Sequence, residues 1–169
     1  MKNIIKNLQF EPATTKHHYV FTKWKKVTRL EEQTCRPIIN GKRVIPSNDI
    51  VTFAFTIPGI DELVGKFQYF DFNDRNRSAE FGYTVNPQFR QQGVGTEMLN
   101  TIIDHLFSST NLNKLYCQTA AFNVASIKLL YKLKFNQDAV LREHHELDGK
   151  LWDDYIYSIL RREWKDREK

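Results

Sequence analysis

The 169-residue chain is poor in the residues that build disulfide scaffolds, linkers and membrane spans, with two cysteines, seven glycines and five prolines. Cys35 and Cys117 lie far apart and have no neighbours at metal-ligand spacing, so we expect neither a metal site nor a disulfide. No apolar run approaches the roughly 20 residues that span a bilayer, which argues against a membrane partner. The N-terminal residues lack the apolar segment of a signal peptide, which predicts a reduced, cytoplasmic protein.

What the chain does contain is typical of a globular enzyme-sized unit. Hydrophobic residues make up 41% of the sequence, and there are 12 Phe, 7 Tyr and 3 Trp. This content excludes a disordered chain, and the length predicts one domain over residues 1–169. A net charge of +5 weakly favours polyanionic partners. The surplus is not gathered in one run, so nucleic acid is the weaker hypothesis for a partner.

Hydrophobic periodicity and turn residues predict an alternating order of strands and helices. An early strand ending near Phe10 and a helix up to about Lys26 precede a poorly readable stretch that includes a second candidate helix over 27–36. The clearer elements are strands at 50–57, 63–72 and 78–85, a helix at 96–107, a strand at 112–119, a helix at 123–133, and strands at 140–147 and 151–160 joined by Asp148-Gly149. This order predicts an α+β fold with a mixed, mostly antiparallel sheet of about six to seven strands and about four helices.

The segment between the strand ending at Val85 and the helix beginning near Thr96 has the features of an anion site. It contains a basic residue, two glycines and a hydroxyl residue: Arg90, Gln91, Gln92, Gly93, Val94, Gly95 and Thr96. The first amides of a helix have no intrahelical acceptor, and glycines allow an anion to approach the backbone. A dinucleotide fold would place its glycines after the first strand, and a P-loop would need Gly-Lys-Ser/Thr. Neither pattern is present.

Two motifs in the same order resemble the GCN5-related N-acetyltransferase (GNAT) superfamily. Arg90, Gly93 and Gly95 match its signature Arg/Gln-x-x-Gly-x-Gly/Ala, and residues 123–135 resemble Asn-x-x-Ser-x-x-Leu-Tyr-x-Lys-Leu-Gly-Phe. The stretch 80–87 looks like the fourth strand of that family. The ending over 149–164 is similar to the ribosomal-protein N-acetyltransferase branch, the RimJ/RimL type. The resemblance covers about residues 4–165.

This resemblance implies the GNAT fold and an acetyl-CoA-dependent N-acetyltransferase without a metal. The acetyl group would pass by direct attack to a primary amine on a protein N-terminus or a small molecule. Two alternatives stay open: a non-catalytic CoA-binding regulatory module, and an acetyltransferase that acts on a ribosome-borne or tRNA-borne amine. A homodimer through an edge strand is a further expectation.

The resemblance also implies which residues hold the cofactor. The pyrophosphate would bind the amides from Gln91 to Thr96 with help from Arg90, and the backbone at Thr84 and Val85 would supply donors to the oxyanion. Asn123 and Ser126 would contact CoA, although an Asn at this position can also cap the helix.

The candidates for proton transfer are Glu80 as the base, and Ser126 and Tyr131 as acids. Alternation places Glu80, Gly82 and Thr84 on one strand face, opposite Phe81, Tyr83 and Val85. The alternative for Glu80 is a surface carboxylate paired with Arg75 or Arg77.

Some positions depart from the family pattern, and others have a structural explanation that requires no catalytic role. Leu130 occupies the position where many relatives have a catalytic Tyr, and Lys134 replaces the usual Gly before Phe135. Either His144 or His145 could shuttle protons, but we interpret both as members of a solvated strand edge. Asp153 and Asp154 could attract a cationic amine or pair with the arginine-rich tail.

Overall fold

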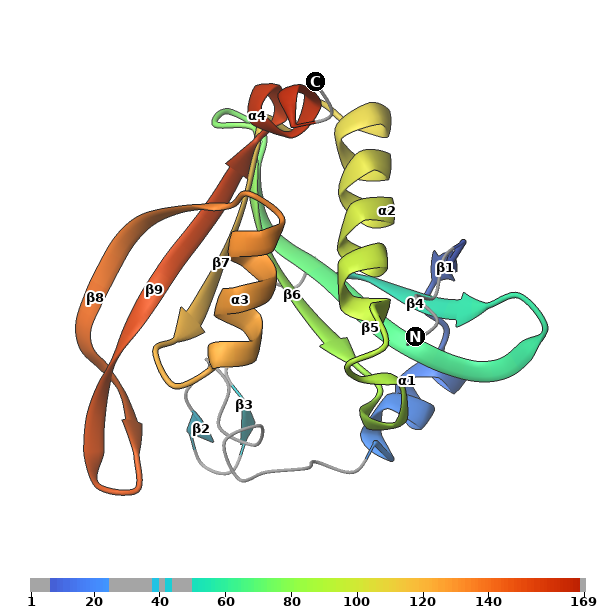
Figure 1. The fold of residues 1–169 in the computed structure, drawn as a ribbon, viewed down its shortest axis with the longest axis horizontal. Helices are drawn as coiled ribbons and strands as arrows, with labels where there is room; N and C mark the ends of the chain where they lie inside the picture. The colour runs from blue at the N-terminus through green and yellow to red at the C-terminus, as the bar shows by residue number, and fades with distance from the viewer. Residues whose placement is uncertain (1–6, 25–37, 40–41, 44–49, 168–169) are drawn as a thin grey trace.

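The computed structural model describes residues 7–24, 38–39, 42–43 and 50–167. Figure 1 shows the elements, which are β1 (Gln9–Pro12), α1 (Thr15–Thr22), β2 (Ile38–Ile39), β3 (Lys42–Arg43), β4 (Val51–Ile57), β5 (Ile60–Asn73), β6 (Ser78–Val85), the 3₁₀ helix η2 (Pro87–Phe89), α2 (Val94–Ser109), β7 (Lys114–Ala120), α3 (Val124–Lys132), β8 (Asn136–Leu147), β9 (Lys150–Leu160) and α4 (Arg161–Asp166). The candidate helix over 27–36 lies outside the described residues.

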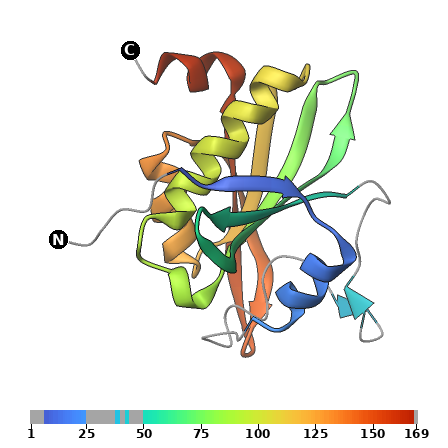
Figure 2. The same cartoon turned by 90° about the vertical axis from the view of Figure 1, so that its right-hand side faces the viewer.

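Seven strands form one sheet in the order β1-β4-β5-β6-β7-β9-β8, and β2 pairs with β3 in a separate two-stranded ladder. Within the large sheet every neighbouring pair is antiparallel except β6 and β7. Figure 2 shows α2 and α3 on one side of the sheet and α1 on the other. The predicted α+β architecture is therefore confirmed.

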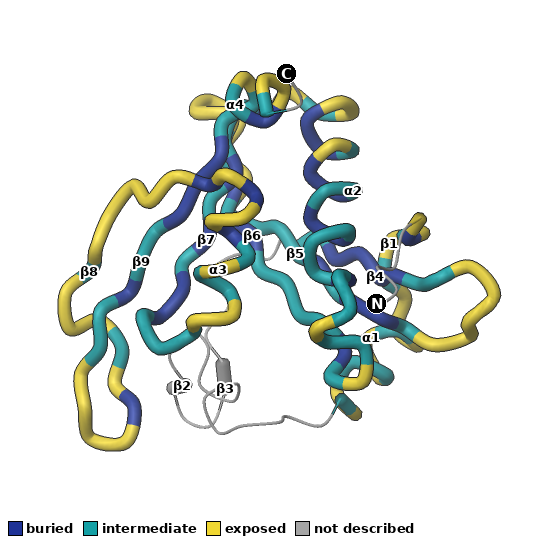
Figure 3. The backbone as a smooth tube through the Cα atoms, in the orientation of Figure 1, coloured by how far each residue is buried: buried dark blue, intermediate teal, exposed yellow. Residues whose placement is uncertain are grey.

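The core lies between the sheet and helix α2. Phe55, Phe67 and Phe81 of the strands are at most 2% exposed, and α2 contributes a buried stripe: Met98, Leu99, Ile102, Ile103, Leu106 and Phe107. These residues recur at helical spacing, so one side of α2 faces the sheet and the other faces solvent (Figure 3). Burial of each such side chain contributes about 1.5–3 kcal/mol, which anchors α2 against the strands.

The parallel strands β6 and β7 pair over only part of their length. Ser78, Ala79 and Glu80 lie opposite Lys114, Leu115 and Tyr116, and the ladder then stops. The remainder of β6 keeps its pairing with β5, and the remainder of β7 keeps its pairing with β9. The sheet therefore opens into a wedge between β6 and β7, at the ends of the strands that lead to α2 and α3.

Arg161 connects the end of β9 to the far end of α2. Its Nε donates to the carbonyl oxygen of Leu112 at 2.7 Å and its Nη2 to that of Thr110 at 2.8 Å, while Nη1 donates to that of Phe107. The last carbonyl groups of a helix lack intrahelical donors, and a positive charge there is favourable. Arg161 therefore caps the end of α2.

Helix α3 ends in a Schellman motif that is built without glycine. The amide of Phe135 donates to the carbonyl of Leu130, and the amide of Lys134 donates to that of Tyr131, both at 3.0 Å. Lys134 adopts the left-handed conformation, with φ of 65°. The usual geometry is thus retained, with the lysine in a conformation that favours glycine.

Several element boundaries differ from the sequence predictions; strand β8, for example, begins at Asn136 and not at residue 140. Helix α2 begins at Val94, two residues before the predicted start, so half of the predicted anion loop belongs to the first helical turn. Strand β1 covers Gln9–Pro12 and includes the proline that was expected to end it. Proline is tolerated here because β1 lies at the edge of the sheet. No helix in the described ranges is long and apolar enough to cross a membrane.

Candidate active site

The N-terminus of α2 presents backbone amides that the fold leaves without acceptors. Gly93 is the N-cap residue, with φ of 88° and no side-chain cap. Gln91 also has a positive φ, 58°, so the chain curls before the helix begins. Within the described residues the amides over 91–96 have no hydrogen-bond acceptor. Such a curl of amides at the positive end of a helix fits a phosphate.

Arg90 and Gly95 connect this amide cluster to β6. The Nε of Arg90 donates to the carbonyl oxygen of Val85 at 3.2 Å. A Cβ on Gly95 would lie 3.0 Å from Leu129 Cδ2 and 3.4 Å from Val85 Cγ2. Gly95 therefore permits a close approach of α2 to α3 and β6, and Arg90 fastens the loop to the end of β6. Arg90 and Gly95 therefore match the family signature and also position the backbone amides over 91–96.

The backbone at the end of β6 divides its amides between two directions. The amide of Asn86 donates to the carbonyl of Val64 on β5 at 2.9 Å. Pairing alternates along an antiparallel ladder, so the amide of Thr84 also points to β5 while those of Val85 and Tyr83 point away from it. The amides of Val85 and Tyr83 face the wedge, where β7 no longer pairs with β6. Of the two predicted oxyanion donors, Val85 therefore offers its amide to the wedge and Thr84 does not.

A hydrogen bond crosses from β6 to α3 beside the wedge. The hydroxyl oxygens of Tyr83 and Ser126 are 2.9 Å apart, and either group can donate. Burial raises the pKa of Tyr83 well above its ordinary range, and the hydrogen bond to Ser126 offsets only part of this rise. Tyr83 is therefore a neutral phenol at physiological pH. Sequence reasoning did not select Tyr83, although alternation placed it on the same strand face as Phe81, opposite Glu80.

The other predicted residues of α3 have clear positions. Asn123 is the N-cap, and its Oδ1 accepts from the amide of Ser126 at 3.3 Å. Leu130 is fully buried, whereas Tyr131 is 77% exposed. Ser126 thus meets Tyr83 at the wedge, while Tyr131 projects to solvent. The structure brings Ser126 together with the end of β6 and leaves Tyr131 apart from it.

The predicted site residues also include Thr96, Gln92 and Glu80. The Oγ1 of Thr96 accepts from Lys132 Nζ at 3.4 Å, so the first turn of α2 contacts the last turn of α3. The amide group of Gln92 donates to the carbonyl of Gln88 at 2.9 Å and stiffens the loop. Glu80 is half-buried at the last position where β6 pairs with β7. It lies opposite Tyr116 on the sheet face away from α2.

The pair His144 and His145 does not form the solvated edge that the sequence suggested. His144 is exposed, but the side chain of His145 is 11% exposed and its Nδ1 lies 3.5 Å from the Oδ1 of Asp154. Asp154 is 1% exposed and accepts from Gln118 Nε2 at 2.6 Å. Of the two alternatives for Asp154, pairing with the arginine-rich tail is not found among the described residues. The cause is the antiparallel register of β9 with β7, which buries this carboxylate. Asp153 instead accepts from the amide of Glu143.

Comparison with known proteins agrees with this geometry. The family described as the Acetyltransferase (GNAT) domain matches residues 7–136. The chain belongs to this GNAT family. A seven-stranded sheet that opens beside an uncapped helix start is thus the scaffold of an acyltransferase domain. Among the described residues there is no group of three or more potential metal-ligating side chains.

This GNAT domain is distantly related to several curated proteins and aligns with only part of the length of each. It is 32% identical to the uncharacterized N-acetyltransferase p20 of Bacillus licheniformis over 66% of this chain and 63% of that protein. It is 26% identical to spermidine N(1)-acetyltransferase of Vibrio cholerae, over 63% and 62%, and 27% identical to the putative ribosomal N-acetyltransferase YdaF of Bacillus subtilis, over 61% and 56%. The chain therefore spans less than two thirds of each of these relatives.

Solved structures share the fold over nearly the whole chain. The spermidine N-acetyltransferase of Vibrio cholerae in complex with CoA and spermine superposes with a TM-score of 0.79. The superposition covers 94% of this chain and 98% of that one, at 18% identity. At this identity the likeness concerns the fold alone.

Proposed function

We propose that this GNAT domain transfers the acetyl group of acetyl-CoA to the primary amine of a small molecule. The observation that carries the proposal is the wedge between β6 and β7, which opens directly beside the acceptor-free amides over 91–96. A helix start of this kind suits a pyrophosphate, and a separated pair of strands suits an extended chain that ends in a thioester. The residues present therefore fit the cosubstrate.

The chain's own groups have separable tasks in this reaction. The amides at the start of α2 bind the pyrophosphate, and Arg90 keeps that loop against the end of β6. The amide of Val85 donates to the carbonyl oxygen of the acetyl group as negative charge develops on it. One such donor contributes about 3 kcal/mol. Alignment of the amine with the acetyl carbon supplies a further large share of the rate.

Proton transfer at the leaving sulfur is assigned to Ser126. The thiolate departs as the new C–N bond forms and the C–S bond breaks, and it then needs a proton. Ser126 Oγ lies on the wedge side of α3, and its partner Tyr83 is a neutral phenol that can pass a proton toward it. Glu80 and the groups near it lie on the other face of the sheet, where the amine approaches, because α2 and α3 cover the first face (Figure 2).

A small polyamine is the acceptor that we favour. One named relative is a spermidine acetyltransferase. The face opposite α2 offers the half-buried carboxylate of Glu80, which suits a cationic acceptor. The weaker alternative is an amine on a ribosomal protein, as the name of the YdaF relative and the RimJ/RimL-like ending suggest.

The experiment that tests the proposal combines binding with turnover. Calorimetry should detect acetyl-CoA binding, and thiol release should be seen with spermidine but not with peptides that carry a free N-terminus. A mass increase of about 42 Da on spermidine would identify the product. Absence of acetyl-CoA binding at millimolar concentration would reject the proposal. Binding without turnover on any amine would instead identify a non-catalytic CoA-binding module.

A further inference from the structure

The carboxylate of Asp154 on β9 lacks one of the hydrogen bonds that its burial demands. The Oδ2 of Asp154 accepts from Gln118, but Oδ1 is buried and has no hydrogen-bond partner in the described residues. The Nδ1 of His145 lies 3.5 Å from that oxygen. Buried carboxylate oxygens are almost always satisfied, so an orphaned one beside an imidazole calls for a functional explanation. A small movement of the ring would complete the bond.

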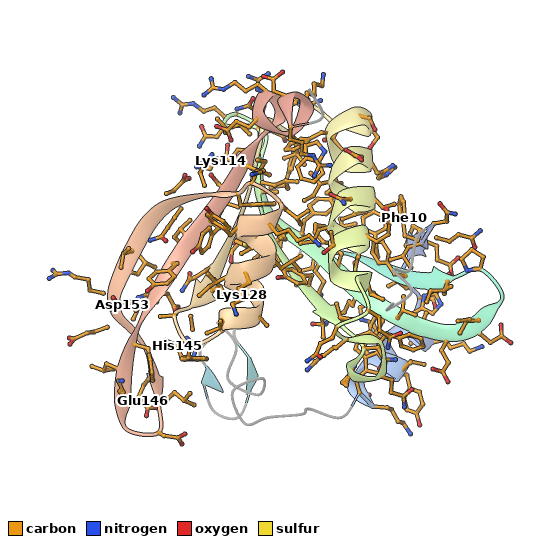
Figure 4. The ribbon with its side chains drawn as sticks, viewed as in Figure 1. Phe10, Lys114, Lys128, His145, Glu146 and Asp153 are labelled. Atoms are coloured by element: carbon orange, nitrogen blue, oxygen red, sulfur yellow. The ribbon has the colours of Figure 1, made fainter. Side chains whose placement is uncertain are left out.

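The surroundings hold His145 in this orientation. The ring of Phe122, in the connection from β7 to α3, meets the imidazole edge-on with centroids 5.1 Å apart, and Trp152 packs against Phe122 at 5.7 Å. The ladder between β8 and β9 is interrupted between Leu141 and His145, and it resumes with His145 opposite Trp152. Interruptions of this kind re-aim side chains. The irregularity therefore turns His145, labelled in Figure 4, inward. His144 remains exposed.

Strand register places this pair on the face from which the acceptor approaches. Residues directly opposite in neighbouring strands share a sheet face, and side chains alternate along each strand. Glu80 is opposite Tyr116, so Gln118, two residues farther along β7, shares its face. Ala120 is opposite Asp154, which places Asp154 on that same face. Phe81 is buried on the other face, under the helices. The pair therefore borders the β7 side of the wedge, and Glu80 borders the β6 side.

A neutral imidazole in this position suits the remaining step of amine acetylation. The acceptor ammonium must lose a proton before its lone pair can attack, and imidazole is the side chain that ordinarily titrates between pH 5 and 8. A carboxylate at Nδ1 holds the tautomer whose Nε2 can accept a proton, and it balances the charge of the imidazolium that forms. We propose that His145, oriented by Asp154, accepts the proton that the acceptor amine gives up in acetyl transfer.

The proposal rests on the proposed function and adds a residue to its site. The first proton moves from the ammonium to Nε2 of His145, and the amine lone pair forms the C–N bond as the thiolate leaves with the C–S electrons. The thiolate takes its proton from Ser126, and the second proton released by the new amide nitrogen restores the Ser126–Tyr83 pair through solvent. His145 then returns its proton to solvent. Asp154 is a positioning residue, because it acts through the imidazole. The charged groups of the neighbouring elements are otherwise engaged or exposed: Asp153 bonds the Glu143 amide, Lys150 lies over Trp152, and Lys128 is exposed on α3.

The first test measures the tautomer of His145 directly. In the full chain labelled with ¹⁵N-histidine, NMR should show the neutral ring of His145 protonated at Nδ1, with the exposed His144 as an internal reference. The Asp154→Asn variant should lose this preference, because a neutral amide no longer selects the Nδ1–H form through charge. A wild-type ring protonated at Nε2 would overturn the proposal, since that nitrogen could not accept the proton.

The second test follows turnover with acetyl-CoA and spermidine over pH 6–9. His145→Gln should lower kcat about 10²-fold at pH 7, the usual scale for loss of a general base, and should change the shape of the pH profile of kcat. His144→Gln, the matched control, should stay within about twofold of wild type. A His145→Gln variant with the wild-type kcat and pH profile, or with a loss confined to KM, would overturn the assignment.

Acetyl-CoA calorimetry separates this failure from failure of the proposed function. His145→Gln should bind acetyl-CoA as wild type does, because the dyad lies on the acceptor side. A wild-type protein that acetylates no amine would reject the proposed function together with the dyad's role. Wild-type turnover that is indifferent to His145→Gln would reject the dyad alone.

Discussion

The hydroxyl oxygens of Tyr83 and Ser126 lie 2.9 Å apart and join β6 to α3 next to the wedge of the sheet. Ser126 belongs to a motif that is visible in the sequence, whereas Tyr83 enters the site only through the packing of β6 under α3. The pair gives the GNAT domain a neutral phenol beside the serine to which we assign proton transfer to the leaving thiolate.

The pH dependence of stability should report the burial of Tyr83. Its pKa is raised in the folded state, so above about pH 10 the unfolded chain loses a proton that the folded chain keeps. Stability that is present below pH 10 is therefore lost as the pH rises further. Urea denaturation at pH 8 to 11 should show this decline, and Tyr83→Phe should flatten it. An unchanged slope in Tyr83→Phe would contradict the assignment; Tyr69 and Tyr157, whose pKa values are also raised, account for the remainder.

Substitution of the two α3 candidates should separate them. Ser126→Ala should lower kcat about 10²-fold, because it removes the hydroxyl beside the leaving sulfur. Tyr131→Phe should leave kcat within about twofold, because the side chain is 77% exposed. Steady-state thiol release measures both. Equal losses in the two variants, or a loss in Tyr131→Phe alone, would show that the exposed tyrosine moves into the site during turnover.

Arg161 should be the most costly arginine of the C-terminal helix to replace. Arg161→Met leaves the carbonyls of Phe107, Thr110 and Leu112 without this donor, which should lower the free energy of unfolding by about 2–3 kcal/mol. Arg162 is exposed, so Arg162→Met should change the free energy of unfolding by less than about 0.5 kcal/mol. Urea titration gives both values, and comparable changes in the two variants would contradict the capping role.

Lys134→Gly should stabilise the protein even though it removes a charge. Lys134 has φ of 65°, a conformation that costs a non-glycine residue about 1–2 kcal/mol. After the greater freedom of glycine in the unfolded chain is deducted, the gain should be about 0.5–1 kcal/mol. Lys128→Gly, in the interior of α3, should have the opposite sign and cost about 1 kcal/mol. Thermal denaturation of the two variants provides the comparison.

Local signals explain why most of the sheet and the cofactor loop could be predicted. The β-branched run before Pro58-Gly59, the Asp148-Gly149 turn and the apolar stripe of α2 each act over a few residues, and all three predictions are confirmed. Gly93 and Gly95 form a motif for the same reason, because an uncapped helix start requires glycine at that point of the chain. The loop that we propose to bind phosphate is therefore readable from adjacent residues.

The sequence by itself determined the order of elements, the family resemblance and the donor side of the site. Only the tertiary structure decided that Tyr83 meets Ser126, that Val85 rather than Thr84 turns its amide to the wedge, and that His145 is turned inward to Asp154. The physical reason is that these relationships depend on strand register and on an irregularity in one ladder. A shift of one residue reverses the face of every side chain, and spacing along the chain does not encode it.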